Sequence, residues 1–342
     1  MSRIPLLADA RIVVAEPGAG DVVLRPPPPR ERLGDVPQAV RDALGFPLSG
    51  EPLERLVTRG GTATLVIEQP SLPIPSAPTS PRHLAIAAAA DELERLGVAQ
   101  TTIVVAGGLL RRASPREIGL LVPPEFRRRF RGRVIVHDAE AEDLVELGRA
   151  GNVTLRVNRA LVETDLVLTV TAAETVVHGG PASLLAATGR ESLRAAGALS
   201  LLETSGSQGW RLAIELERML AGHVPVTGVA LALNVPHLAG PFAGYPYDDE
   251  AAERIVGSRA RRLFQVAPGG MRQRLLDRVP RELSAAAVYG GAPSVAHTEA
   301  LIRGTVFKGV QLDEPVDALV IGIPGTTPWI PRERPNPVSA AY

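Results

Sequence analysis

The chain has 342 residues, 45% of them hydrophobic, and its 37 basic and 37 acidic side chains give a formal net charge of zero. This length and hydrophobic content suggest about two domains with a sizeable core and disfavour disorder. The charge balance disfavours a general polyanion binder, so we expect no nucleic-acid and no membrane partner. Cysteine is absent, which excludes disulfides and thiolate chemistry and fits a cytoplasmic location.

Residues 1–60 are predicted to form an amino-terminal arm that packs on the first domain. The arm contains a strand candidate at Arg11–Ala15, a run of four prolines at Pro26–Pro29 and a weak helical pattern from Pro37 to Leu44. Its first residues carry acids and lack a long apolar run, so we expect no signal peptide.

From Thr62 onward, short apolar strands alternate with helices. The pattern predicts a strand at Thr64–Glu68, a helix from Ser80 to Leu96 that Gly97 ends, and a strand at Thr101–Ala106. Further strands are predicted at Arg133–Val136, Val153–Val157 and Asp165–Val170, with a helix at Glu140–Arg149. This alternation is typical of a largely parallel sheet covered on both faces.

The second half continues the α/β pattern after a linker-like SGSQG segment at 205–209. We expect a first α/β domain over 61–207 and a second over 208–342, with mainly parallel sheets flanked by helices and a ligand cleft between the domains. The carboxyl end looks like the start of a helix, so we expect the second domain to be incomplete there. A helix is predicted at Ala182–Ala196, before this boundary. After it, helices are predicted at Gly209–Leu220, Asp248–Leu263 and Thr298–Ile302, and buried strands at Val224–Leu233 and Ala318–Ile323.

Ligands in open parallel sheets bind beyond the carboxyl ends of the strands, so the loops there are the first candidates. After Thr101–Ala106, Gly107 and Gly108 would let backbone amides approach an anion, and Arg111 could bind a carboxylate or phosphate. A tight turn with solvated arginines is the alternative. No zinc-protease, α/β-hydrolase or EF-hand motif is present.

Two histidines follow predicted strands and are candidates for acid/base chemistry. His137 precedes Asp138, an arrangement suited to proton transfer, although Asp138 as a helix N-cap explains the pair more simply. His178 precedes Gly179 and Gly180 before a helix, and it suits proton transfer or a ligand at a helix amino terminus; a structural histidine is the alternative. In the second half, Arg303 could bind a carboxylate or lie on an ordinary capped helix.

These segments resemble the nickel-dependent lactate racemases and their homologues, well over Thr62–Leu220 and loosely over 224–303. The resemblance rests on the order and spacing of QPSLPIP (69–75), AGGLLR (106–111), SPREI (114–118), the His137-Asp138 pair, VNR (157–159), ETDLV (163–167), and His178. It implies a two-domain α/β protein that binds a nickel pincer nucleotide between its domains. Such proteins racemise small 2-hydroxy acids by moving a hydride to the cofactor and back, while paired histidines exchange the hydroxyl proton.

Carried onto this sequence, the expected site has His178 and His137 as catalytic residues and Arg111 and Arg303 as ligands of a small anionic substrate. The expected cofactor-binding residues are Ser71, Gly107, Gly108 and Asn158.

The chain departs from the family pattern at several places. Gln69, Leu72 and Leu110 stand where the family has Asp, Arg and His, and residues 179–205 contain neither a lysine tether nor a second histidine. The only lysine, Lys308, lies far along the chain. We therefore assign no metal ligand and leave the cofactor unknown. Two functions remain: a racemase or epimerase of a small 2-hydroxy acid, or a catalytically silent homologue that binds a small carboxylate or nucleotide or supports a partner subunit. A homo-oligomer is compatible with either.

Overall fold

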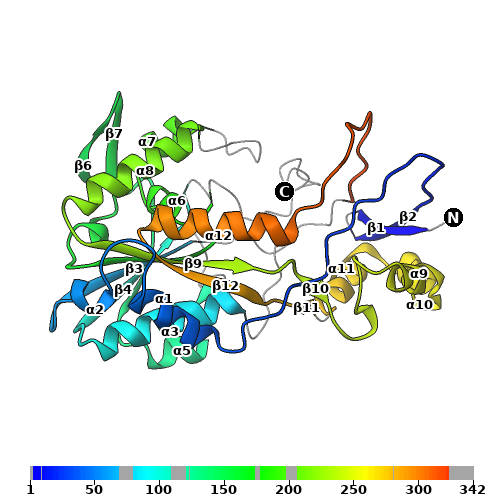
Figure 1. Ribbon diagram of the computed structural model, residues 1–342, viewed down its shortest axis with the longest axis horizontal. Coiled ribbons are helices and arrows are strands. Elements are labelled where there is room, and N and C mark those ends of the chain that lie inside the picture. The colour runs from blue at the N-terminus through cyan, green and yellow to red at the C-terminus, as the bar shows by residue number, and fades with distance from the viewer. Residues whose placement is uncertain are drawn as a thin grey trace.

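The computed structural model describes residues 3–8, 10–68, 80–108, 121–122, 124–173, 178–197, 206–279 and 281–322. A six-stranded sheet forms its centre, in the order β12-β9-β8-β3-β4-β5 (Figure 1). Five strands are parallel, and β12 runs antiparallel to β9 at one edge. The strands are β3 (Thr62–Glu68), β4 (Gln100–Ala106), β5 (Arg133–Val136), β8 (Val167–Ala172), β9 (Val226–Leu233) and β12 (Ala285–Gly291).

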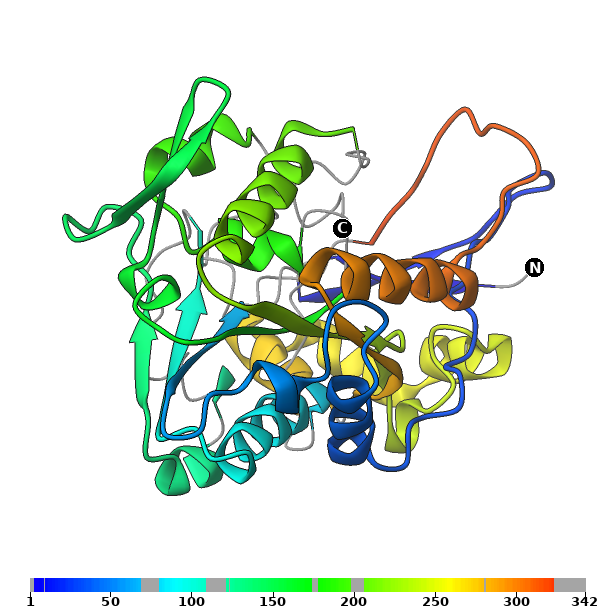
Figure 2. The ribbon, with the colours of Figure 1, turned by 60° about the vertical axis from the view of Figure 1, so that its left-hand side comes forward.

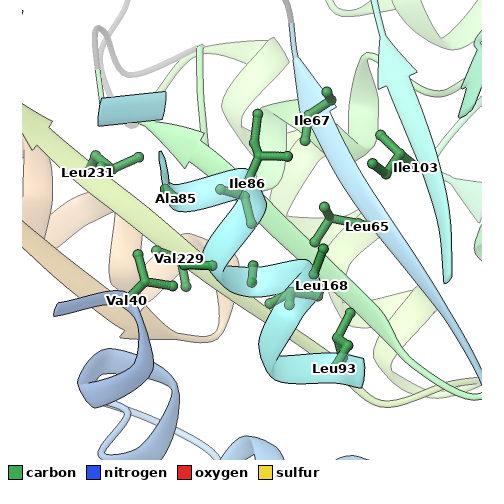
Figure 3. Close-up of a cluster of buried hydrophobic side chains, with 14 of the residues drawn as sticks. Val40, Leu65, Ile67, Ala85, Ile86, Leu93, Ile103, Leu168, Val229 and Leu231 are labelled. Atoms are coloured by element: carbon green, nitrogen blue, oxygen red, sulfur yellow. The ribbon is translucent and has the colours of Figure 1, made fainter. Parts of the chain in front are cut away.

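The central strands bury both faces, because successive side chains alternate between two hydrophobic clusters. In β3, Leu65 and Ile67 belong to one cluster while Val66 belongs to the other. The first cluster also receives Leu168 and Leu231 from neighbouring strands (Figure 3). The near-continuous apolar runs in the sequence are therefore explained by a parallel sheet that is covered on both sides.

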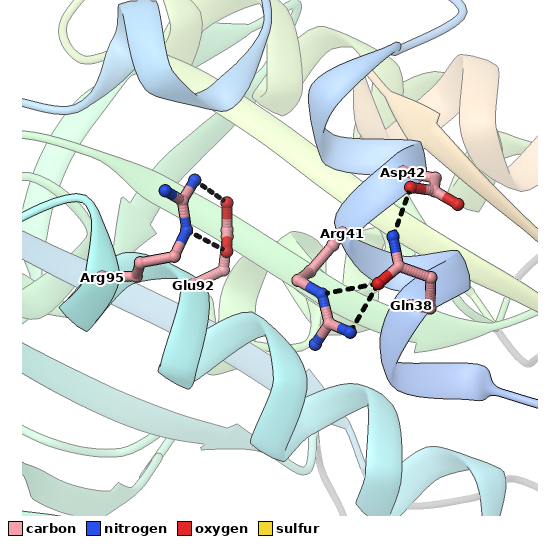
Figure 4. A network of polar contacts seen from close by, with 5 residues as sticks. All are labelled: Gln38, Arg41, Asp42, Glu92 and Arg95. Carbon is pink, nitrogen blue, oxygen red and sulfur yellow. Dashed lines mark hydrogen bonds and ion pairs between the residues drawn. The ribbon is translucent and has the colours of Figure 1, made fainter.

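Helices cover the two faces of the sheet (Figure 1). On one face, α1 (Val36–Gly45) packs against α3 (Pro81–Arg95), and α5 (Pro124–Arg129) lies beside them. Their polar sides carry local contacts such as Gln38 with Arg41 and Asp42, and Glu92 with Arg95 (Figure 4). The other face carries α6 (Pro181–Leu185), α8 (Gln208–Ala221) and α12 (Pro293–Lys308).

A smaller region lies beyond the end of β9. The amino-terminal β-hairpin, β1 (Ile4–Ala8) and β2 (Arg11–Ala15), packs against α9 (Asp249–Gly257) and α10 (Arg259–Val266) (Figure 2). The remaining elements are α2 (Leu53–Leu56), the β6–β7 hairpin (Val145–Ala150, Val153–Val157), η1 (Arg159–Leu161), α7 (Arg190–Ala195), β10 (His237–Leu238), η2 (Gly240–Phe242), α11 (Gly269–Asp277) and β11 (Arg281–Glu282).

The α/β class and the mainly parallel sheet are confirmed. The sheet continues across the boundary expected near residue 207, since β9 and β12 pair into the same sheet as β3 and β8. No helix in the described part of the chain is long and apolar enough to cross a membrane.

The helix predicted at Glu140–Arg149 is wrong. Residues 145–150 form β6, which pairs antiparallel with β7 across the two-residue Gly151-Asn152 loop. Gly148 sits at a register irregularity with φ of +154° and Gly151 at +58°, conformations that interrupt a helix and suit a bulge and a tight turn. Val153–Val157 is a strand as predicted, but it belongs to this hairpin and not to the central sheet.

Two further expectations need correction. The helix over Ala182–Ala196 is divided into α6 and α7, with Gly189 beginning the second helix in extended conformation. Over 318–322, the described part of the strand predicted at Ala318–Ile323, the chain is irregular and largely exposed instead of buried. Apolar composition predicted a strand there, but no neighbouring strand among the described residues supplies hydrogen bonds.

Candidate functional site

The carboxyl ends of the parallel strands meet at one edge of the sheet. Glu68 pairs in register with Ala106, and Val105 pairs with Val136, so β3, β4 and β5 end side by side. The loops in which open α/β sheets bind ligands therefore gather at this edge. Ser71 and Arg111 belong to two of those loops and lie outside the described residues.

His178 lies between β8 and α6 in a tightly held turn. It is half-buried, and Gly179 and Gly180 follow it with φ of +100° and +52°. The Gly180 N–H donates to Thr171 Oγ1 on β8 (2.9 Å), and Ser183 Oγ on α6 donates to the Gly180 carbonyl (2.6 Å). These bonds fix the backbone beside His178 and so limit where its imidazole can lie.

The glycine pair is required because α12 passes very close to this turn. A β-carbon at Gly180 would lie 2.4 Å from Cβ of His297, and one at Gly179 would lie 2.7 Å from His297 Nδ1. His297 is fully buried, and its ring centroid lies 6.1 Å from that of Trp210 on α8. Positive φ and the lack of space together explain why only glycine fits at both positions.

A buried carboxylate anchors the amino terminus of α12. Glu217 on α8 accepts hydrogen bonds from the backbone N–H of Ser294 (2.9 Å) and from its hydroxyl (2.8 Å). Burial raises the pKa of Glu217, and the two bonds from Ser294 partly oppose that rise. The N-cap residue Ala292 has no side chain able to cap, so Glu217 satisfies an otherwise orphaned helix donor from another element.

His137 follows β5 and is 5% exposed. Its Nε2 lies 2.9 Å from the Thr188 carbonyl, and its Nδ1 lies 3.3 Å from Asn158 Nδ2. Asn158 Oδ1 in turn accepts the Ala160 N–H, so the amide nitrogen is the group that faces the ring. This pattern fits a neutral imidazole that donates from Nε2 and accepts at Nδ1.

The structure therefore brings two predicted site residues together, but in a buried structural link. His137 and Asn158 join the ends of β5 and β7 to the segment between α6 and α7. Asp138 accepts the N–H of Glu140 in a turn with no helix after it, so the N-cap alternative is not what forms.

Gly107 and Gly108 follow β4 as expected, but their amides differ. Gly108 has φ of +57°, and its N–H donates to the Ala186 carbonyl at the end of α6 (3.0 Å). A β-carbon at Gly107 would meet no atom within 4 Å. Gly108 thus ties this loop to the helix that follows His178. The space beside Gly107 is open, so of the two glycines it is the one whose backbone a ligand can approach.

Arg303 lies on the outer side of α12 instead of at the sheet edge. Its Nε donates to Glu299 one helical turn earlier (2.9 Å), and both side chains face solvent. The Glu299 carboxylate is the main cause of the raised pKa of Arg303, with a further contribution from Tyr289. The arginine is therefore used in a local ion pair.

One titratable pair at the same edge was not among the predicted site residues. His237 follows β9, and its Nε2 lies 3.2 Å from Glu282 Oε2 across the β10–β11 pairing. The available signal was the same one that selected His137 and His178: a histidine directly after a predicted strand. Glu217, by contrast, sits inside an ordinary helix, and nothing in the sequence separates it from its exposed neighbours.

The residues present do not fit a covalently tethered nickel nucleotide. Lys308 ends α12 with its Nζ 5.9 Å from the Phe307 ring centroid, more than a hundred residues beyond His178. Within the described ranges, no group of three or more His, Asp or Glu side chains is placed to hold a metal ion. We therefore derive no chemical step through that group.

Comparisons with known proteins agree with the resemblance based on residues. Residues 19–180 match the family model of the lactate racemase N-terminal domain. The structure of the lactate racemase apoprotein from Thermoanaerobacterium thermosaccharolyticum has the same fold, with a TM-score of 0.58 at 12% identity. The alignment covers 88% of this chain and 62% of that one, so the chain spans less than two thirds of that protein's length.

A crystal structure of a Thermotoga maritima protein aligns over 80% of this chain and 60% of its own, with a TM-score of 0.47 and 14% identity. A search of curated proteins by sequence finds no match. The family-model match over residues 19–180 and the fold shared with the lactate racemase apoprotein make the chain lactate racemase-like in its amino-terminal part and in its α/β fold.

Proposed function

We propose that this chain is a racemase or epimerase of a small 2-hydroxy acid in the cytoplasm, with His178 as its acid/base residue. The observation that carries the proposal is the turn after β8. It holds a half-buried histidine at the carboxyl edge of a parallel sheet, and a glycine pair that α12 presses upon fixes its backbone. A proton-transfer residue needs such a fixed position within reach of the substrate.

The matched lactate racemase N-terminal domain supports the substrate class, and Arg111 is the proposed ligand of the substrate carboxylate. Arginine suits that task because its guanidinium can form two parallel hydrogen bonds with a carboxylate.

A panel of single-enantiomer 2-hydroxy acids, followed by chiral chromatography, tests the proposal. His178→Ala should lower turnover by at least about 100-fold, the usual minimum for a general acid/base. The matched control is His223→Ala, which removes an exposed histidine after α8. Equal turnover in all three proteins, or none in the wild type on any acid, would reject the proposed activity.

A binding protein without turnover is the second candidate. It is favoured by His137, whose two ring nitrogens both contact neighbouring groups, and by the absence of a lysine from residues 179–205. Calorimetric titration with the same acids separates the two. For an enzyme, His178→Ala loses turnover while affinity changes little; for a binder, Arg111→Ala loses affinity and His178→Ala has no turnover to lose.

A further inference from the structure

Two exposed segments of this neutral chain carry opposite charge. The first is the basic helix pair, α10 and α11 with the turn between them. Residues 259–278 contain six arginines and one acid, a net charge of +5. The second is the acidic strap, residues 309–322, with three acids and no basic residue, a net charge of −3.

Within the described residues, ion pairs do not neutralise the charge of the basic helix pair. By comparison, ten of the arginines elsewhere in the described structure lie within 4.0 Å of a carboxylate. In the helix pair, Arg261 and Arg272 donate to backbone carbonyls, and no ion pair within the described residues includes any of its arginines. The exposed ones are Arg259, Arg262, Arg274 and Arg278.

Aliphatic side chains accompany these charges. On the helix pair, Leu263 is 72% and Val266 is 82% exposed, and Met271 and Leu275 are also exposed. No residue of α10 is buried, although the helix is amphipathic. An exposed apolar surface edged by charge is typical of an interaction site.

The acidic strap has the same mixed character with the opposite charge. The sequence predicts a buried strand over Ala318–Ile323, yet the apolar residues of the strap are 43–77% exposed: Val310, Leu312, Val316, Leu319, Val320 and Ile321. Asp313, Glu314 and Asp317 lie among them and are exposed as well. Such a conflict between local sequence and environment is resolved when another surface covers the segment.

Within one copy, the strap and the helix pair lie on different sides of the β1–β2 hairpin, as Figures 1 and 2 both show. The strap ends against β1, where a β-carbon at Gly322 would lie 3.0 Å from the Leu7 carbonyl. Gln265 of α10 donates to the Ile12 carbonyl of β2 (2.7 Å). The hairpin separates the two surfaces, which favours contact between copies.

We propose that a second copy of this chain covers both surfaces, with the acidic strap of each copy on the basic helix pair of the other. At full extension, the fourteen residues of the strap would reach roughly 45 Å. That exceeds the combined lengths of α10 and α11, which are about 12 and 14 Å. Burying aliphatic side chains would supply affinity, and the opposed charges would set the register. Because the same two copies exchange both straps, the contact closes as a two-fold dimer.

Sedimentation velocity on the full chain at about 100 µM, a concentration that detects micromolar association, tests this proposal. We expect a dimer at low salt that weakens near 1 M NaCl, where charges are screened beyond about 3 Å. Arg262→Glu with Arg274→Glu should give a monomer, and so should Asp313→Lys with Asp317→Lys. The two variants should form a heterodimer when mixed, because the unaltered strap of one variant then meets the unaltered helix pair of the other, a contact that neither variant can form with itself.

Matched controls reverse exposed charges elsewhere: Arg194→Glu with Arg211→Glu, and Glu31→Lys with Glu94→Lys. These should remain dimeric, and circular dichroism checks that every variant is folded. A monomeric wild type, including one whose strap folds onto its own helix pair, overturns the proposal. A dimer that survives both reversals, or two monomeric variants that fail to pair, overturns it equally.

Discussion

Two strand ends in this molecule carry a histidine in nearly the same topological position, yet they differ in kind. His137 after β5 is 5% exposed, with its ring held between a carbonyl and an amide. His178 after β8 is half-buried, and hydrogen bonds of Gly180 with Thr171 and Ser183 hold the turn beside it. The buried ring contacts of His137 show that a histidine at a strand end is not by itself sufficient evidence for chemistry.

The largest expected effect concerns the turn after β8, which holds His178. Gly180→Ala places a β-carbon 2.4 Å from His297 Cβ at a φ of +52°. We expect a loss of about 3–5 kcal/mol in the free energy of unfolding, because strain and overpacking act together. Urea denaturation measures it. Gly107→Ala is the control: open space predicts a change below about 1 kcal/mol, and a similar loss in both variants would contradict this account.

The second largest expected effect concerns His137, which follows β5. His137→Ala leaves the Thr188 carbonyl and the Asn158 amide without their partner in a buried site. We expect a loss of about 2–4 kcal/mol in unfolding free energy. Asn158→Ala tests the same link, and a double-mutant cycle should show coupling between the two. Additive losses would mean that the side chains do not support each other.

A smaller, pH-dependent effect concerns the helix that presses on the β8 turn. Burial raises the pKa of Glu217 in the folded state above its unfolded value of 4.5. The folded protein therefore binds the proton more tightly, and this group's contribution to stability falls as pH rises from the unfolded pKa through the folded one. The free energy of unfolding, measured across that pH interval, should fall less in Glu217→Gln than in the wild type. Parallel pH curves would show that Glu217 does not titrate there.

The smallest effect lies on α12 outside both strand ends. Arg303→Ala removes an exposed ion pair with Glu299, so we expect stability within experimental error of the wild type. Affinity for a 2-hydroxy acid should also be unchanged. A tenfold weaker Kd would show that Arg303 leaves Glu299 to bind the ligand, as the sequence predicted.

The fold was predictable where periodicity was strong. Continuous apolar runs such as 101–106 identified the central strands, because only a sheet covered on both faces buries every residue of a strand. The β6 strand was missed because its sequence, VELGRA, has no clear alternation of apolar and polar residues. The Gly151-Asn152 turn is a stronger indication of the hairpin than the sequence of the strand itself. The strand expected at 318–322 failed because its composition cannot show whether a neighbouring strand exists.

The sequence placed the site at the carboxyl edge of the parallel sheet, but it did not show which residues there are available to a ligand. Strand ends selected His137, His178 and Gly108, but one sequence does not show which groups are already used. The bonds of His137 to Thr188, fifty-one residues away, and of Gly108 to Ala186 are tertiary contacts. Glu217 was missed for the same reason, because its partner Ser294 comes from a distant helix.

The central claim is that a small 2-hydroxy acid contacts His178 and not His137. Nitrogen-15 NMR of the six histidine side chains during titration with the acids of the activity panel tests it most directly. The account predicts that the ring resonances of His178 shift on binding while those of His137 stay in place, with Nε2 protonated throughout. Shifts confined to His137, or to neither ring when binding is demonstrated, would contradict it.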